Sequence, residues 1–262
     1  MLAKRLIARL DVKFPNLIKT VRLEGLKVVG DPGKYAARYN FFGIDEILFL
    51  DIVASLYGRN HLADLVERTT EEAFCPVTVG GGVRCVEDVK ILLRAGADKI
   101  ALNTAATENP ALITELAEKF GSQCVVLQID AKKTGQSWEA WKNGGREPTG
   151  LDAVSWAKRG VELGAGEILL TSIDREGTQK GFDLELIRAV RASVPVVASG
   201  GMGVAEHAIQ AIEAGADGVA AAHVLHHGIL SIDKIKKGMS SAGYHVRCET
   251  ESSASPAPHG TG

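Results

Sequence analysis

Short apolar runs alternate with longer amphipathic segments along most of the chain. The runs, rich in aliphatic and β-branched residues, lie at 6–10, 47–50, 77–79, 99–102, 124–129, 167–170, 196–199 and 218–221. They are almost continuously apolar, which is typical of parallel strands buried on both faces. The segments between them have helical periodicity; residues 110–120, for example, begin with proline and are followed by Gly121. This pattern predicts an α/β fold, a (β/α)8 (TIM) barrel, in one domain over residues 1–248.

An internal repeat divides the predicted barrel into halves. Residues 79–105 align without gaps to residues 198–224, and residues 43–48 (GIDEIL) recur as residues 164–169 (GAGEIL). The third and fourth predicted strands therefore match the seventh and eighth, and the second matches the sixth. We interpret the barrel as two fused half-barrels.

Composition narrows the class of protein. The 262 residues carry 30 basic and 32 acidic side chains, so nothing indicates a nucleic-acid or membrane partner. The 29 glycines and 5% aromatic residues favour an α/β enzyme over an antiparallel sandwich. Cysteines and histidines lack metal-ligand spacing, so no metal or cofactor is predicted. The N-terminal residues lack a signal-peptide core, which predicts a cytoplasmic protein, and residues 249–262 are expected to be a disordered tail.

Two aspartates follow predicted strands at equivalent places in the repeat. Asp11 ends the first strand and Asp130 ends the fifth, 119 positions later, which is also the offset of the longer repeat. In a (β/α)8 barrel such positions face the active site, and an apolar surrounding raises a carboxyl pKa toward values useful for proton transfer. The alternative is that each aspartate caps a helix or pairs with a nearby lysine. Their symmetric placement favours catalysis.

Glycines and helix starts are paired in the same way. Gly82 and Gly201 lie in glycine clusters after the third and seventh strands. Asn103 with Thr104, and Ala222 with His223, begin helical segments after the fourth and eighth strands. Backbone N–H groups at such places bind phosphate, so two sites on opposite sides of one mouth predict a ligand with two phosphates. The alternative is that the glycines only close tight turns.

Two other groups of polar residues have both a functional and a structural interpretation. The loop from Thr171 to Thr178 follows the sixth strand and is equally a site loop or a solvated turn. Four charged residues at strand starts are expected to form an ion-pair ring at the bottom of the barrel, where residues usually serve stability; they are Arg5, Glu46, Lys99 and Glu167.

Several segments together resemble the cyclase subunit of imidazole glycerol phosphate synthase, a barrel of histidine biosynthesis. The likeness covers residues 1–247 and rests on MLAKRLIARLDVK, GIDEILFLDI, VTVGGGV, GADKIALNTAA, IDAKK, GAGEILLTSIDREGT, VVASGG and AGAD. It implies that Asp11 and Asp130 are an acid/base pair. In the family this pair adds ammonia to an open-chain, bis-phosphorylated ribonucleotide. The products are imidazole glycerol phosphate and an aminoimidazole carboxamide ribonucleotide.

The same resemblance implies further roles. Lys19 matches the lysine of the family's mobile first loop, and Arg5, Glu46, Lys99 and Glu167 match the gate of its ammonia channel. The matching substrate- and phosphate-binding residues are Gly82, Asn103, Thr104, Thr171, Gly177, Ser199, Gly201, Ala222 and His223. A separate glutaminase subunit would form a heterodimer at the lower face, where Asp98 matches an interface position.

Three departures from the family pattern leave an alternative function. Arg9 stands where the family usually has cysteine, Phe14 to Asn16 replace its Asp-Gly-Arg, and His223 replaces a serine. These changes resemble a paralogous branch that delivers ammonia to a sugar amidotransferase in surface-polysaccharide synthesis. A cyclase is favoured because Asp11 and Asp130 are both present. Arg9 is expected to point into the barrel and to pair with an acid such as Asp51, or to bind an anionic ligand.

Overall fold

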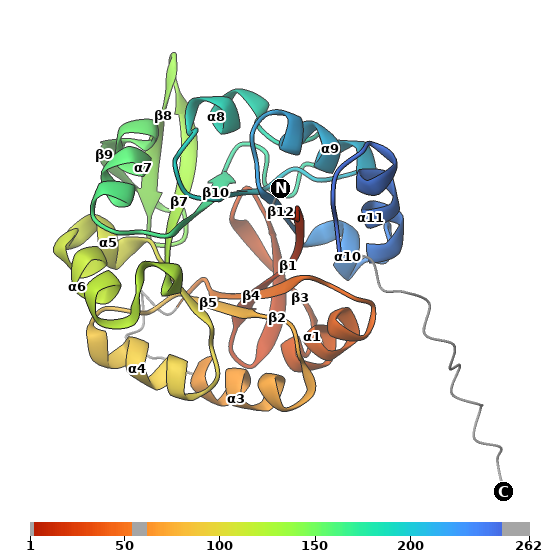
Figure 1. Ribbon diagram of the computed structural model, residues 1–262, viewed down its shortest axis with the longest axis horizontal. Helices are drawn as coiled ribbons and strands as arrows, with labels where there is room; N and C mark the ends of the chain where they lie inside the picture. Colours follow the sequence, from red (N-terminus) through yellow and green to blue (C-terminus); the bar gives the residue numbers. More distant parts are fainter. Residues whose placement is uncertain (1–2, 54–61, 248–262) are drawn as a thin grey trace, which may run out of the picture.

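The computed structural model describes residues 3–53 and 62–247, and it confirms the predicted barrel. Eight parallel strands form a closed ring with helices around it (Figure 1). The ring closes because β10 pairs with β7 as well as with β11. Its strands are β1 (Arg5–Lys13), β4 (Glu46–Asp51), β5 (Val77–Gly80), β6 (Lys99–Leu102), β7 (Val125–Thr134), β10 (Glu167–Ser172), β11 (Val196–Ser199) and β12 (Gly218–Ala221). The expected tail, residues 249–262, lies outside the described residues.

Helices follow the strands and cover the outside of the ring. They are α1 (Pro32–Phe41), α3 (Leu62–Glu72), α4 (Val86–Arg94), α5 (Thr104–Glu108), α6 (Ala111–Phe120), the 3-10 turn η1 (Ser122–Cys124), α7 (Ala153–Glu162), α8 (Leu184–Ala189), α9 (Ala205–Glu213), α10 (His223–His226) and α11 (Ile232–Ser241). The helix predicted at 110–120 is α6, with Pro110 at its N-cap and Gly121 at its C-cap. No helix among the described residues is both long and apolar enough to cross a membrane.

Local side-chain chemistry explains where several helices begin. The carboxylate of Asp31 accepts a hydrogen bond from the Lys34 backbone N–H at 2.9 Å, which caps α1. Asp152 caps α7 in the same way, and the Ser231 hydroxyl caps α11. These side chains satisfy backbone donors that have no partner within their own helix, so each helix starts at a defined residue.

Alternation along the strands separates two apolar layers. One face of each strand packs against the helices and forms the larger core. The other face fills the inside of the barrel with a smaller cluster: Ile7, Leu48, Leu50, Ala101, Val126, Leu169, Val197 and Ala220. Because side chains repeat every two residues, Arg5 lies below this inner layer on β1, and Arg9 and Asp11 lie above it. The layer thus separates a lower end of the barrel from an upper mouth.

Two antiparallel hairpins extend the barrel in a way that the strand–helix pattern did not predict. The first consists of β2 (Asn16–Val21) and β3 (Glu24–Gly30), and β2 pairs with the end of β1. The second consists of β8 (Ser137–Lys142) and β9 (Glu147–Asp152), and β8 pairs with the end of β7. Figure 1 shows β8 reaching beyond the ring of helices. The hairpins follow the symmetry-related strands, so they extend the half-barrel repeat.

Candidate active site

The two symmetry-related aspartates lie inside the mouth of the barrel. Asp11 pairs with Ile18 at the start of the first hairpin, and Asp130 pairs with Trp141 at the start of the second. Each aspartate is 1% exposed. Neither caps a helix or pairs with one of the nearby lysines, because their contacts are to side chains of the barrel interior described below. Two buried carboxyl groups are therefore held at equivalent places inside the barrel.

Arg9 forms the central ion pair of this space. Its Nε donates to Asp11 Oδ1 at 2.8 Å, and its Nη1 donates to the hydroxyls of Thr171 at 3.0 Å and Ser199 at 2.9 Å. The expectation that Arg9 points into the barrel is correct, but the expected partner Asp51 is wrong. Asp51 is on the adjoining strand β4, and its carboxylate accepts the Val53 backbone N–H. Arg9 and Asp11 share a face of one strand, so the acid two residues away is the nearer partner.

Asp130 is held by amides instead of a cation. Gln128 Nε2 donates to both of its carboxylate oxygens, at 3.2 and 3.1 Å, and Asn103 Nδ2 donates to Oδ2 at 3.0 Å. Burial raises the pKa of Asp130; the positive charge of Arg9 and the hydrogen bond from Gln128 oppose this rise without reversing it. A carboxyl with a raised pKa keeps its proton to higher pH than an ordinary aspartate, as a general acid requires.

Two cavities open around these residues, and Arg9 lines both of them. The larger, of about 370 Å³, lies on the side of Asp130, and the smaller, of about 20 Å³, lies on the side of Lys19. The larger cavity includes Gly82, Asn103, Thr104, Gln128 and Asp130. The smaller includes Lys19, Gly177, Ser199, Gly201, Ala222 and His223. The two groups of predicted phosphate-binding residues thus lie in separate lobes of one mouth.

Asn103, which lines the larger lobe, has an unpaired polar atom. Asn103 is the N-cap of α5 and Thr104 its first residue, as the sequence predicts. The Thr104 hydroxyl accepts the Asn143 backbone N–H at 3.0 Å, which connects α5 to the second hairpin. Among the described residues, buried Asn103 Oδ1 has no hydrogen-bond partner. Leaving such an atom unpaired costs about 1–3 kcal/mol, so this residue keeps one acceptor unused at the wall of the lobe.

The smaller lobe depends on close backbone contacts. Gly201 has φ +107°, and a Cβ built there would lie 2.2 Å from the Gly181 carbonyl oxygen. His223 is the first residue of α10, as predicted; burial and the neighbouring His227 lower its pKa, so its ring is neutral at pH 7. Its buried Nδ1 has no hydrogen-bond partner within the part of the chain that the structure describes.

Lys19 lies in the connection that follows β1, but on strand β2 and not in an irregular loop. Its ammonium group forms a buried ion pair with Glu176 and donates to the Thr20 carbonyl at 2.8 Å. Glu176 belongs to the loop after β10, and Gly177 in the same loop packs against the backbone of Thr20 and Val21. Lys19 and Glu176 therefore join the first hairpin to the loop that borders the smaller lobe.

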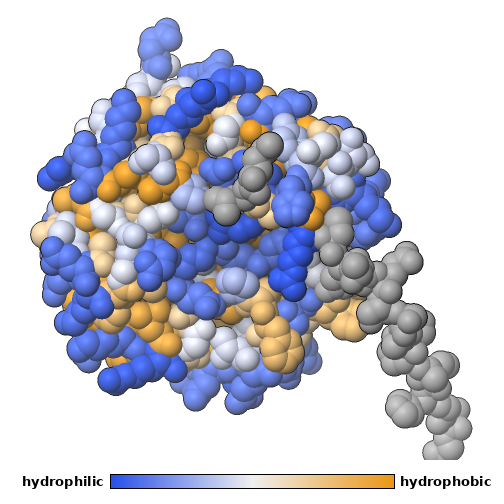
Figure 2. All heavy atoms as spheres, viewed as in Figure 1, coloured by the Kyte–Doolittle hydropathy of each residue, from blue (hydrophilic) through white to orange (hydrophobic). Residues whose placement is uncertain are grey.

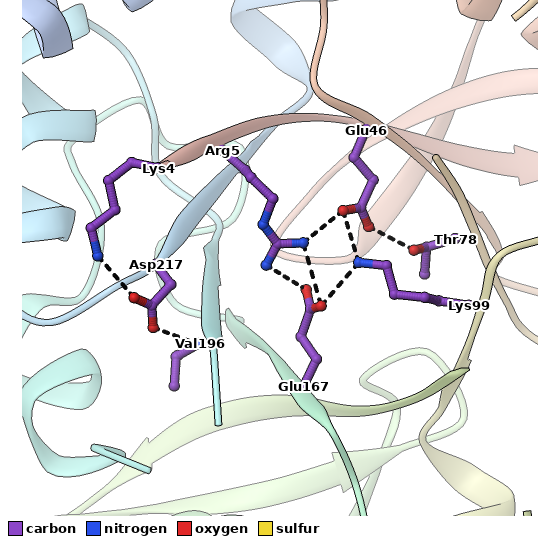
Figure 3. Close-up of polar contacts among 8 residues, drawn as sticks. All are labelled: Lys4, Arg5, Glu46, Thr78, Lys99, Glu167, Val196 and Asp217. Carbon is purple, nitrogen blue, oxygen red and sulfur yellow. Dashed lines mark hydrogen bonds and ion pairs between the residues drawn. The ribbon is translucent and has the colours of Figure 1, made fainter. Parts of the chain in front are cut away.

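The four charged residues at strand starts form a closed ring at the lower end of the barrel. Figure 3 shows Arg5 and Lys99 each between Glu46 and Glu167. Arg5 lies 2.7 Å from Glu46 and 3.0 Å from Glu167, and Lys99 lies 2.8 and 2.9 Å from the same carboxylates. Burial opposes the charge of Arg5, but Glu167 and Glu46 outweigh it and raise its pKa. The ring closes the bottom of the inner apolar layer.

Some residues of the site escaped sequence reasoning. Gln128 precedes Asp130 by two residues on the same strand, so strand alternation alone could have placed it beside the aspartate. Asn143 belongs to a hairpin that was not predicted. Asp98 is exposed, and its carboxylate accepts the Val77 backbone N–H at 2.8 Å. No group of three or more His, Cys, Asp or Glu residues in the described ranges could hold a metal ion.

Comparison with known proteins gives consistent matches. The family model "Histidine biosynthesis protein" matches residues 5–231. Three relatives bear the name imidazole glycerol phosphate synthase subunit HisF. The chain is 61% identical to that of Legionella pneumophila, over 76% of this chain and 95% of the relative. It is 51% identical to that of Mycobacteroides abscessus, over 94% of this chain and 99% of the relative. It is 52% identical to that of Myxococcus xanthus, over 95% of this chain and 100% of the relative.

Proposed function

Because this chain belongs to the histidine biosynthesis protein family, as a cyclase subunit of imidazole glycerol phosphate synthase, we propose that Asp11 and Asp130 are its acid/base pair. The observation that carries the proposal is their placement. Two carboxyl groups, each 1% exposed, lie at symmetry-related positions inside one mouth. Addition of ammonia to a carbonyl carbon, with loss of water, needs one group that donates a proton and one that accepts a proton.

The two lobes support a substrate with a phosphate at each end. Gly82, Asn103 and Thr104 would hold one phosphate in the larger lobe through backbone N–H groups and the hydroxyl. Lys19, Gly177, Gly201, Ala222 and His223 would hold the other. Thr171 and Ser199, which contact Arg9 between the lobes, would face the middle of the substrate. We propose the open-chain bis-phosphorylated ribonucleotide as this substrate and no bound cofactor.

The lower end of the barrel supports entry of ammonia from a glutaminase subunit. In this proposal the ring of Arg5, Glu46, Lys99 and Glu167 is a gate. Ammonia that passes it enters the inner apolar layer, which offers no competing proton acceptors. It then reaches Arg9 and the aspartates, which lie above the layer.

An apolar surface beside the gate supports docking of the glutaminase there. Helices that follow parallel strands return to the lower end, so the residues that end α1 and α3 lie at that face. Phe41, Phe42 and Phe74 are 70, 54 and 88% exposed. Figure 2, which views this end, shows a hydrophilic centre and apolar side chains over α1 and α3. Asp98, just before β6, belongs to the same proposed interface.

The alternative function, delivery of ammonia to a sugar amidotransferase, has no support from the comparisons. The relatives from Legionella, Mycobacteroides and Myxococcus all carry the name of the HisF subunit. We therefore do not propose a sugar amidotransferase as a partner.

The experiment that tests the proposed function is turnover of the ribonucleotide with excess ammonium. Asp11→Asn and Asp130→Asn should each lower kcat by at least about a hundredfold, which is typical when a general acid or base is lost, while circular dichroism shows an intact fold. Wild-type rates in both variants would contradict the assignment.

A further inference from the structure

The residues that precede the two aspartates break the symmetry of the site. Arg9 stands two positions before Asp11 and Gln128 two positions before Asp130, and both lie on the face of the strand that carries the aspartate. Arg9 Nε donates to Asp11 at 2.8 Å, and Gln128 Nε2 donates to Asp130 at 3.1 Å. At equivalent positions of the half-barrel repeat, the first half therefore has the guanidinium of Arg9 and the second half has the neutral amide of Gln128.

We propose that Arg9 and Gln128 are positioning residues that give the two aspartates opposite roles: Arg9 holds Asp11 as a carboxylate, and Gln128 leaves the proton on Asp130. The proposal rests on the proposed function of the aspartates as an acid/base pair. It assigns Asp11 as the group that accepts a proton from the attacking nitrogen. Asp130 is then the group that donates a proton to the departing oxygen, which leaves as water.

Hydrogen-bonding chemistry separates the two positions. Arginine carries a fixed positive charge and only donors, so its ion pair with Asp11 favours the charged carboxylate over the neutral acid. Glutamine has both an amide N–H and a carbonyl oxygen. A half-turn of the Gln128 amide would let its carbonyl oxygen accept the proton of a neutral Asp130. Gln128 therefore accommodates either form of its partner, whereas the positive charge of Arg9 favours the carboxylate.

The balance of buried charges leads to the same assignment. Arg9 is 2% exposed and pairs with Asp11, and the nearby Lys19 pairs with Glu176. No further cation among the described residues forms an ion pair with Asp130. A second bare carboxylate in this space would be costly, and burial raises the pKa of Asp130 accordingly. The other charged or titratable groups around the pair and the two lobes are Lys19, Asp51, Arg84, Glu108, Glu176, His223 and His226.

The free oxygen of Asp11 fits the role of proton acceptor. Oδ1 of Asp11 is engaged by Arg9, whereas buried Oδ2 has no hydrogen-bond partner within the described residues. Both oxygens of Asp130 instead accept from amide side chains. Within this part of the chain, Asp11 thus keeps one carboxylate oxygen without a hydrogen bond, whereas Asp130 keeps none.

The first test locates the proton without turnover. In protein labelled with carbon-13 at the aspartate carboxyl carbons, we expect one resonance at the position of a protonated acid at pH 7. This resonance should disappear in Asp130→Asn. A wild-type spectrum in which every aspartate is ionised at pH 7, or a protonated resonance that persists in Asp130→Asn, would overturn the proposal.

The second test is the pH dependence of kcat/KM at a constant concentration of free ammonia. Arg9→Gln removes the buried cation and should move the acidic limb of the profile to higher pH by at least about one unit, a tenfold loss on the acidic side. Arg9→Lys keeps a cation and should return the limb toward the wild-type position. Arg159→Gln is the control: the same change at an exposed ion pair with Glu162 on α7, away from the site, should leave the limb in place.

The two tests separate this inference from the proposed function. If the wild-type protein turns over the ribonucleotide with ammonium and Arg9→Gln leaves the acidic limb unmoved, the inference is wrong and the function stands. If Asp11→Asn and Asp130→Asn turn over at the wild-type rate, the proposed function is wrong. Should Arg9→Gln fold poorly, the labelled wild-type and Asp130→Asn proteins still decide the inference.

Discussion

A buried histidine shows how a single residue responds to its surroundings. His226 Nδ1 is 2.7 Å from the Tyr39 hydroxyl, and its ring packs against the rings of Tyr39 and Tyr35. Its buried Nε2 has no partner among the described residues. Burial lowers the pKa of His226 from 6.5 to about 4, and the negative charge of Asp11 offsets only part of this fall.

This histidine should make the protein sensitive to acid. The pKa of His226 is lower in the folded than in the unfolded chain, so the unfolded chain binds a proton more readily. The free energy of unfolding therefore has its full value above pH 6.5 and falls as the pH drops toward 4. The full effect is about 3 kcal/mol. His226→Asn can accept a hydrogen bond from the Tyr39 hydroxyl and does not titrate. In this variant, the free energies of unfolding measured in urea at pH 7 and pH 4.5 should no longer differ by this amount. His227→Asn, at an exposed neighbour, is the control, and equal pH dependence in the two variants would contradict the prediction.

Gly201 illustrates a backbone constraint on the smaller lobe. Gly201→Ala should lower the free energy of unfolding by about 1–3 kcal/mol and weaken substrate binding, because its Cβ would meet the Gly181 carbonyl oxygen. Gly135→Ala is the control, since Gly135 also has a positive φ, +62°, but nothing within 4 Å of its Cβ. Chemical denaturation should show a smaller loss for Gly135→Ala. Equal losses would mean that only the backbone angle matters at Gly201.

Among the elements, the two antiparallel hairpins border the mouth of the barrel. The first is joined to the loop after β10 by Lys19 and Glu176, which are both 5% exposed at their side chains. The second supplies Asn143 to the larger lobe. Each lobe is therefore bordered by a hairpin that follows the strand of one of the two aspartates.

The Lys19–Glu176 pair should show the energetics of a buried salt bridge. Lys19→Met should destabilise the protein by about 3–5 kcal/mol, because Glu176 is left as a buried unpaired charge. Lys19→Met with Glu176→Gln should recover most of that loss. Chemical denaturation of the single and double variants measures the difference, and hydrogen exchange in β2 locates it. A double variant no more stable than Lys19→Met would contradict this explanation.

Some of the secondary-structure elements could be predicted from the sequence and others could not. The eight barrel strands were predictable because buried parallel strands are continuously apolar. The turn of the first hairpin is formed by Arg22 and Leu23 with φ values of 53 and 61°, without the glycine or asparagine that normally marks such a turn. Strand β3 is largely exposed and has no apolar face to detect. The second hairpin does carry a signal, Asn143 followed by two glycines, all with positive φ.

The candidate site was predictable to the level of strand ends. Symmetry in the repeat located Asp11 and Asp130, and strand alternation placed Arg9 inside the barrel. The partner of Arg9 was not predicted, since it depends on how the guanidinium folds back along its own strand. Glu176 could not be singled out because its role requires the unpredicted strand that carries Lys19.

In the whole molecule, the ion-pair ring of Arg5, Glu46, Lys99 and Glu167, the inner apolar layer and the mouth lie one above the other. With a glutaminase subunit bound, Lys99→Met should lower the amount of product formed per glutamine hydrolysed, because it removes one cation of the ring. Lys90→Met, at a partly exposed pair on α4, is the control. Simultaneous assays of glutamate and product give the ratio. If Lys99→Met forms as much product per glutamine hydrolysed as the wild type, the ring has a structural role and is not a gate.

The lower face should also determine affinity for the glutaminase. Phe74→Asp places a charge on the exposed apolar surface and should weaken the heterodimer at least about tenfold, as loss of a central aromatic contact does. Val28→Asp, on the hairpin at the opposite end, is the control; Val28 is 60% exposed. Titration calorimetry measures both variants. Equal affinity of Phe74→Asp and wild type would exclude Phe74 from the interface.

The two ends of the described barrel meet at this lower face. The Lys4 backbone N–H donates to the His245 carbonyl at 2.8 Å, and Lys4 and Val246 form a parallel bridge. A short linker could therefore join these ends, and new termini could be opened between α6 and β7, where the half-barrels meet. Such a circular permutant would be translated with its second half first and would still close the same ring, with Asp130 synthesised before Asp11. The order of the two halves along the gene is thus not dictated by the shape of the barrel.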